Sequence, residues 1–146
     1  MRLEGLTESQ RKRIQLATEN IPFASLLGIK VESVGAGVAS MVLKVRPDLL
    51  QNNGVVHGGA IASLIDSVTA FAVIPLLADD ETASTVDLTV TFIRPLQSGT
   101  VTASARVLRA GSRIIALSAE VMDELGNLTA TGLTTYLRQS KRRNKS

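Results

Sequence analysis

The stretch that decides the fold reads QNNGVVHGGAIASLIDSVTAFAVIPLLA and runs from Gln51 to Ala78. Its beginning, up to Gly54, is rich in turn-forming residues and predicts a loop. The part from Gly58 to Ala78 has no polar stripe wide enough for a surface helix, which predicts a helix that is buried on most sides. This helix carries one carboxylate, Asp66, near its middle.

On either side of this helix, apolar and polar residues alternate with the period of two that is typical of β-strands. The pattern predicts strands over 29–34, 38–46, 85–92, 101–107, 115–121 and 129–138. Short connections between the last four strands favour an antiparallel meander. A short polar helix over 7–20 precedes them, begun by Thr7 or Ser9 and ended by Pro22. The fold class is therefore α+β, with an antiparallel sheet of about six strands around one long helix.

A single sheet covers only one flank of a helix that is apolar on nearly all sides. The other flank needs a second surface, and a copy of the same chain is the simplest one to supply it. We therefore expect a homodimer at least.

Composition limits the classes of function. The chain has 146 residues, enough for one domain, and 45% of them are hydrophobic. Aromatic residues make up 3% and tryptophan is absent, which argues against nucleic-acid binding by base stacking. The absence of cysteine excludes disulfides and thiolate chemistry. Four of the positive charges lie at the C-terminus, on Lys141, Arg142, Arg143 and Lys145. Since the net charge of the whole chain is +3, the rest of the chain carries 3 − 4 = −1.

Two segments bear on membranes and localisation. Residues 1–20 are charged and lack the apolar core of a secretory signal. The apolar segment 58–78 contains Asp66 and has no partner span, which makes it a poor transmembrane candidate. We expect a soluble, cytoplasmic protein that binds neither membranes nor nucleic acid.

The densest chemical signal is His57-Gly58-Gly59 at the predicted junction of loop and helix. The first N–H groups of a helix have no partner within it and lie at the positive end of its dipole, so they suit a developing oxyanion. Asp66 lies eight residues after Gly58, about 12 Å along a helix. Reacting atoms must approach to about 3–3.5 Å, so one helix cannot supply both groups to one site. Two antiparallel copies of the helix could supply both.

Each of these residues also has a structural interpretation. The lone histidine can serve as an ordinary structural group, and the glycine pair can serve a turn or close packing. Asp66 is harder to explain structurally, because burying an unpaired carboxylate costs several kcal/mol. No group of side chains has the spacing of metal ligands, so we expect no metal and no cofactor.

The run from Gly54 to Ala60, with Asp66 nine residues after His57, resembles the signature of hotdog-fold acyl-CoA thioesterases of the PaaI-like branch. Residues 85–95 resemble the strand that follows in that family. The resemblance covers residues 25–138. It leaves an N-terminal helical segment over 1–24 and a basic flexible tail over 139–146.

The resemblance implies a hotdog fold and hydrolysis of acyl-CoA thioesters. By motif position, Asp66 is the nucleophile or general base, the Gly58 amide polarises the thioester carbonyl, and His57 organises the site or the leaving thiolate. Gln51 stands where the family often has an asparagine near the thioester or the attacking water, and Thr85 would contact the acid or its water. The residues expected to bind the substrate or the CoA phosphates are Asn53, Gly59, Arg109 and Arg113.

Two other functions remain open at this point. One is an acyl-CoA binding or sensing module without turnover, and the other is a hotdog enoyl-CoA hydratase or dehydratase. In each case the expected partners are an acyl-CoA and further copies of the chain, as a dimer or as a tetramer built from two dimers.

Overall fold

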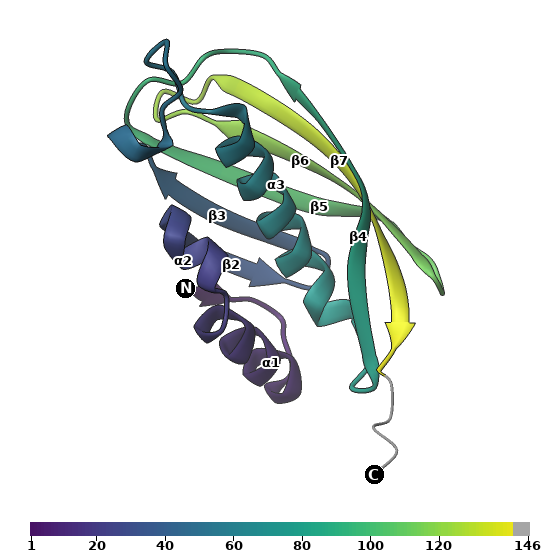
Figure 1. Ribbon diagram of the computed structural model, residues 1–146. Coiled ribbons are helices and arrows are strands. Elements are labelled where there is room, and N and C mark those ends of the chain that lie inside the picture. The colour runs from purple at the N-terminus through teal and green to yellow at the C-terminus, as the bar shows by residue number, and fades with distance from the viewer. Residues whose placement is uncertain (142–146) are drawn as a thin grey trace.

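The structure, a computed structural model, describes residues 1–141. One long helix lies across a curved sheet, and the strands bend around it (Figure 1). The elements in chain order are β1 (Arg2–Leu3), α1 (Glu8–Glu19), α2 (Pro22–Leu27), β2 (Ile29–Gly35), β3 (Val38–Lys44), η1 (Pro47–Leu49), α3 (Gly58–Val73), η2 (Ile74–Leu76), β4 (Glu81–Phe92), β5 (Thr100–Ala110), β6 (Ile114–Met122) and β7 (Leu128–Ser140).

The strand order is β1-β2-β3-β5-β6-β7-β4. All neighbours pair antiparallel except β1 and β2, which are parallel. The α+β class is confirmed, and the seventh strand is the two-residue β1, too short to show a periodic pattern. The prediction that the last four strands form a meander is wrong for β4. This strand follows the helix and pairs with β7 at one edge of the sheet, whereas β5 pairs with β3.

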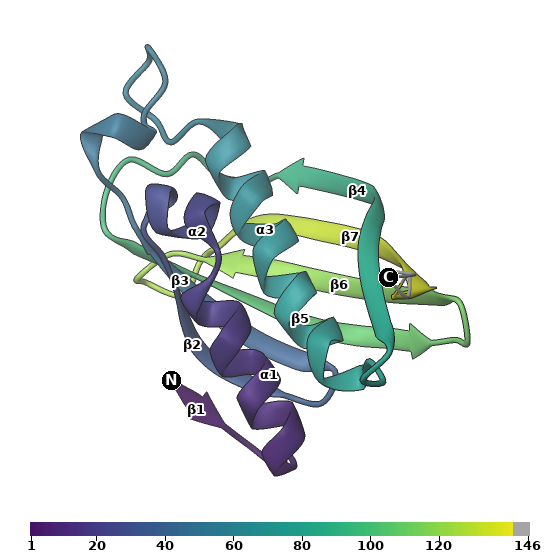
Figure 2. The same cartoon turned by 60° about the horizontal axis from the view of Figure 1, so that its bottom comes forward.

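The N-terminal segment packs on the same side of the sheet as α3 (Figure 2). Thr7 caps α1, as expected, in a capping box with Gln10. Pro22 begins α2 instead of only ending α1, because a proline at the first helical position loses no hydrogen bond. The boundary expected at residue 24 therefore falls inside α2. At the other end, β7 continues to Ser140, and the remainder of the expected tail, from residue 142, lies outside the described residues.

The core lies between α3 and the sheet. The fully buried side of α3 includes Leu64, Ile65 and Val68, while Ala62, Asp66 and Ala70 on another side are only half-buried. The stretch Gly58–Leu76, which comprises α3 and η2, is long and apolar enough by length and composition to cross a membrane. Its most apolar 18 residues have a mean hydropathy of 1.8, but 56% of this segment is buried inside the protein. One flank of α3 thus remains open, as the sequence predicts.

Candidate active site at the first turns of α3

Backbone hydrogen bonds hold the loop before α3 in place. The His57 N–H donates to the Leu49 carbonyl and the Val56 N–H to the Leu96 carbonyl, each at 2.7 Å. These bonds tie the start of α3 to η1, which follows β3, and to the connection between β4 and β5. The helix therefore begins at a position fixed by the sheet.

His57 is the N-cap of α3, and its ring Nδ1 accepts a hydrogen bond from the Gly59 N–H at 2.8 Å. In a neutral ring this arrangement places the proton on Nε2, and the ring itself is exposed. The Ala60 N–H donates to the His57 carbonyl at 2.9 Å. Among residues 1–141 the Gly58 N–H has no hydrogen-bond partner, so it is the amide of this turn that is free to bind an oxyanion.

Asp66 is half-buried and faces β4 and β7. The Thr85 hydroxyl donates to Asp66 Oδ1 at 2.8 Å, which is the contact expected of a strand hydroxyl at that position. The Tyr136 hydroxyl lies 2.9 Å from the Asp66 carbonyl oxygen and 3.3 Å from Oδ1. The carboxylate is thus held from one side by hydroxyl groups of the sheet.

The sequence reasoning missed Tyr136 and Thr69. The Tyr136 hydroxyl lies 3.0 Å from Thr69 Oγ1, and both side chains are buried. Burial raises the pKa of Tyr136 to about 12, with a smaller contribution in the same direction from the charge of Asp66. Tyr136 is the only tyrosine in the chain and stands at a core-facing position of its strand, and this signal could have drawn attention to it.

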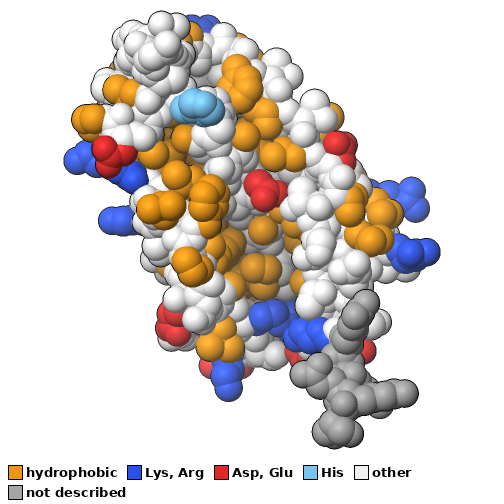
Figure 3. Space-filling view, viewed as in Figure 1, with side chains coloured by type: hydrophobic (Ala, Val, Ile, Leu, Met, Phe, Trp, Pro, Cys, Tyr) orange, Lys and Arg blue, Asp and Glu red, His pale blue; other side chains and the backbone are white. Residues whose placement is uncertain are grey.

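Two apolar clefts border the first turn of α3. One of about 420 Å³ lies toward α2 and is mostly apolar; its lining residues are Phe23, Leu27, Asp48, Leu49, Leu50, His57, Gly59, Ala60 and Ser63. The other, of about 400 Å³, lies toward the end of β4 and includes Gly58, Ile61 and Phe92. Figure 3 shows this face of the molecule, where hydrophobic side chains gather around the chain's single histidine.

The other predicted residues lie apart from Asp66 or already have partners in the loop. Gln51 Oε1 accepts a hydrogen bond from the Asn53 N–H at 3.1 Å, so both residues stabilise the turn before α3. Arg109 and Arg113 are exposed and line a depression of about 320 Å³ at the β5–β6 hairpin. The structure thus brings the two arginines together, and their binding roles stay predictions.

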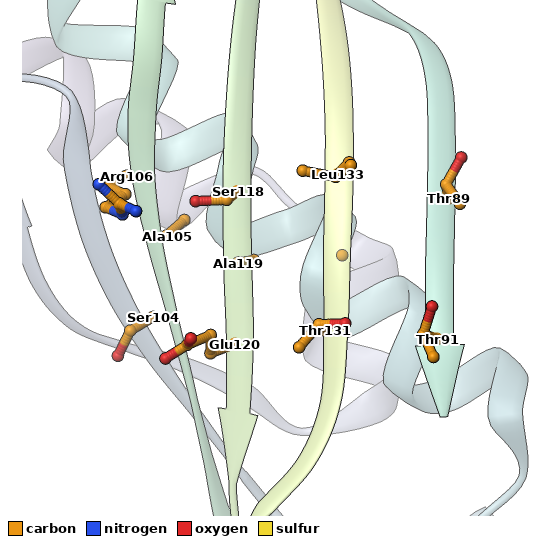
Figure 4. A pocket seen from close by; sticks show the side chains of 11 residues that line it. Thr89, Thr91, Ser104, Ala105, Arg106, Ser118, Ala119, Glu120, Thr131 and Leu133 are labelled. Atoms are coloured by element: carbon orange, nitrogen blue, oxygen red, sulfur yellow. The ribbon is translucent and has the colours of Figure 1, made fainter. Parts of the chain in front are cut away.

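A further depression, of about 470 Å³, lies on the face of the sheet opposite α3 (Figure 4). Hydroxyl side chains of β4 to β7 line it together with Arg106 and Glu120. None of the predicted site residues belongs to it. Among residues 1–141, no group of three or more histidine, aspartate and glutamate side chains could hold a metal ion.

A curved, almost wholly antiparallel sheet around one long central helix is the hotdog fold, which solved thioesterase structures share. The chain belongs to the thioesterase superfamily, whose family model matches residues 53–130, more than half of its length. This membership supports thioester hydrolysis as the general reaction.

Individual proteins show the same similarity. The Mycobacterium tuberculosis (strain H37Rv) protein Rv1847 is 34% identical over 115 residues, which cover 77% of this chain and 82% of that protein. The medium/long-chain acyl-CoA thioesterase YigI of Escherichia coli K12 is 26% identical over 149 residues, covering 90% and 96%. The solved structure of E. coli PaaI, from the phenylacetic acid degradation operon, superposes with a TM-score of 0.84 at 25% identity, covering 93% and 97%.

Proposed function

We propose that this protein hydrolyses acyl-CoA thioesters in active sites shared between two protomers. Asp66 of one protomer would act on a thioester whose carbonyl oxygen is bound by the Gly58 N–H of the other. The observation that carries the proposal is that this free N–H and this carboxylate lie on one helix, eight residues or about 12 Å apart.

A twofold axis can bring the two groups together. If two α3 helices pack antiparallel, Gly58 of one lies beside Asp66 of the other when the axis passes halfway between them, next to Ala62. At 100° per residue, Gly58, Ala62 and Asp66 fall within about 80° of one another around the helix. Ala62 is small and half-buried, which would permit two helices to approach closely.

Strand β4 supports the same assembly. It ends the sheet, it is 12 residues long, and most of its residues are exposed. Its exposed apolar side chains include Val86, Leu88 and Phe92. An exposed, partly apolar edge strand is a ready surface for pairing with another chain. We therefore propose a dimer through α3 and β4, which could pair further into a tetramer.

In the proposed reaction, the Asp66 carboxylate either attacks the thioester carbon or takes a proton from water that attacks it. Attack breaks the C–S bond and releases CoA as a thiolate, which then takes up a proton; in the first route, water afterwards cleaves the mixed anhydride. The Gly58 N–H stabilises the negative oxygen that forms on the carbonyl, and loss of such a donor costs about 10²–10³-fold in rate.

The clefts suit the substrate class. The walls contributed by Phe23, Leu27 and Leu49 are apolar and would accept an aliphatic acyl chain. The exposed Arg109 and Arg113 would meet the phosphates of CoA. The relative YigI, with its medium- and long-chain substrates, supports an aliphatic acyl group.

The first test measures thiol release from acyl-CoAs of increasing chain length. The wild type should hydrolyse them, and Asp66→Asn should lose about 10²-fold or more because it can neither attack nor take a proton. Equal rates for the two proteins would overturn the assignment of Asp66. Tight acyl-CoA binding without turnover, or hydration of an enoyl-CoA alone, would overturn thioester hydrolysis.

The second test asks whether the site is shared. Asp66→Asn is mixed with Gly58→Pro, which removes the N–H at a helix position where proline is tolerated. Random exchange of protomers should restore about one quarter of the sites if each needs both chains. No recovery would show that both groups act from one protomer. Gly58→Ala, which keeps the N–H but meets the Phe92 ring at 3.0 Å, separates the steric effect from loss of the donor.

The third test addresses the proposed axis. Sedimentation should give a mass of two or four times 15.5 kDa for the wild type. Ala62→Arg places two like charges next to the axis and should dissociate the dimer and abolish hydrolysis together. A monomeric wild type that is fully active would refute the shared site.

A further inference from the structure

Tyr136 connects the sheet to the carboxylate that the proposed reaction uses. It lies on β7 with 3% of its surface exposed, so it cannot contact a substrate directly. Its hydroxyl has three acceptors in reach: the Asp66 carbonyl at 2.9 Å, Asp66 Oδ1 at 3.3 Å and Thr69 Oγ1 at 3.0 Å. A tyrosine hydroxyl has one proton, so it can serve only one of these acceptors fully at a time.

The Thr69 hydroxyl has its own acceptors in the helix, the carbonyls of Ile65 and Asp66, each at 3.0 Å. The Asp66 carbonyl therefore has a second donor besides Tyr136. When Asp66 is ionised, the charged Oδ1 is the acceptor that gains most from the tyrosine proton, because hydrogen bonds to an ionised group are about twice as strong as neutral ones.

The two carboxylate oxygens differ in their surroundings. Oδ1 is within reach of two donors, the hydroxyls of Thr85 and Tyr136. Among residues 1–141, Oδ2 has no hydrogen-bond partner. An oxygen that accepts two hydrogen bonds is a weaker nucleophile and base than one that accepts none.

We propose that Tyr136 is a positioning residue that, together with Thr85, holds Oδ1 of Asp66 and so leaves Oδ2 as the oxygen that attacks the thioester or takes the proton from water. This inference rests on the proposed function, since it assigns the roles of the two oxygens within that reaction. It adds a buried residue of β7 to a site otherwise made from α3 and β4.

Burial fits Tyr136 for this role. Because burial raises its pKa to about 12, the Tyr136 hydroxyl keeps its proton at neutral pH. The buried hydroxyl is thus available as a donor at neutral pH.

The test compares Tyr136→Phe with the wild type on the same acyl-CoA. Removing a donor to a charged group should lower kcat about tenfold. KM should change little because Tyr136 does not reach the substrate, so the loss should fall on kcat alone. Ile14→Val, a buried change in α1 outside the site, is the control for a general loss of stability. It should leave both kcat and KM unchanged.

A second measurement does not depend on activity. Because Tyr136 is the only tyrosine, growth on 3-fluorotyrosine labels this site alone. Its ¹⁹F resonance should differ between the wild type and Asp66→Asn, because the variant has no charged oxygen to accept the tyrosine proton. A wild type that hydrolyses no thioester would refute the proposed function. If the wild type is active, two results would refute the role of Tyr136 and leave the proposed function standing. One is an equal kcat for Tyr136→Phe and the wild type, and the other is an equal ¹⁹F chemical shift in the wild type and in Asp66→Asn.

Discussion

The contact between α3 and β7 is tight enough that one added methyl group should destabilise the fold. A Cβ atom at Gly132 would lie 2.7 Å from Cγ2 and 3.3 Å from Cδ1 of Ile65. Ile65 is completely buried, so it has no solvent-side space into which it could move. Overpacking of this kind costs about 1–3 kcal/mol. About 0.4–1 kcal/mol of this is offset because alanine leaves the unfolded chain less conformational entropy than glycine does.

We therefore expect Gly132→Ala to lower the free energy of unfolding by about 1–2 kcal/mol. Urea unfolding followed by far-UV circular dichroism measures this change at fixed protein concentration. Leu133→Ala is a useful control because it changes the next residue of β7, whose side chain is 56% exposed. Away from such tight contacts, a surface substitution changes stability by about 0.5 kcal/mol or less.

A double-mutant cycle separates the clash from other effects. Ile65→Ala removes both offending atoms and should cost about 2–5 kcal/mol on its own through the cavity it leaves. The double variant should be more stable than the sum of the two losses by about 1 kcal/mol or more, because the new methyl group occupies part of that cavity. A Gly132→Ala protein as stable as the wild type, with strictly additive losses in the cycle, would refute the close approach of α3 to β7.

Three further predictions concern stability and titration. The absorbance of tyrosinate reports Tyr136 alone, since the chain has one tyrosine and no tryptophan, and its midpoint should lie near pH 12. Because burial raises this pKa, Tyr136 contributes about 2–3 kcal/mol of stability below pH 10, and that contribution is lost between about pH 10 and 12 in alkaline urea titrations. Thr7→Ala should cost about 1 kcal/mol in the same assay, through loss of the cap on α1. The Ala78 N–H and then Arg138 lower the pKa of Glu81. The contribution of Glu81 to the free energy of unfolding is therefore present above the ordinary glutamate pKa and fades as the pH falls. Glu81→Gln should remove that part of the acid dependence of unfolding.

Local patterns identify most elements of this fold because each pattern has a local cause. The alternation of apolar and threonine residues predicts β4, and the apolar run after His57 predicts α3. Thr7 caps its helix through atoms only three residues apart, which a sequence can reveal. The place of β4 beside β7 depends instead on how the chain crosses the sheet, and no neighbouring residue encodes that.

The candidate site divides in the same way. His57, Gly58 and Asp66 lie within ten residues of one another, so the sequence alone predicts their spacing along one helix. The contact of Tyr136 with Asp66 joins residues 70 positions apart, and it depends on the register between β7 and α3. The loop role of Gln51 escaped prediction for another reason, since a long amide side chain can turn toward the substrate or toward its own backbone.

The pair of glycines after His57 has a steric explanation that connects the motif to its chemistry. A Cβ at Gly59 would lie 2.9 Å from His57 Nδ1, the atom that accepts the Gly59 N–H, so a side chain there would push the ring away. A Cβ at Gly58 would lie 3.0 Å from the Phe92 ring, so the ring would have to shift. With both glycines present, the histidine satisfies one amide of the turn and the neighbouring amide remains open. The motif therefore leaves one donor at the start of α3, and Gly58, which carries it, lines the cleft beside Phe92.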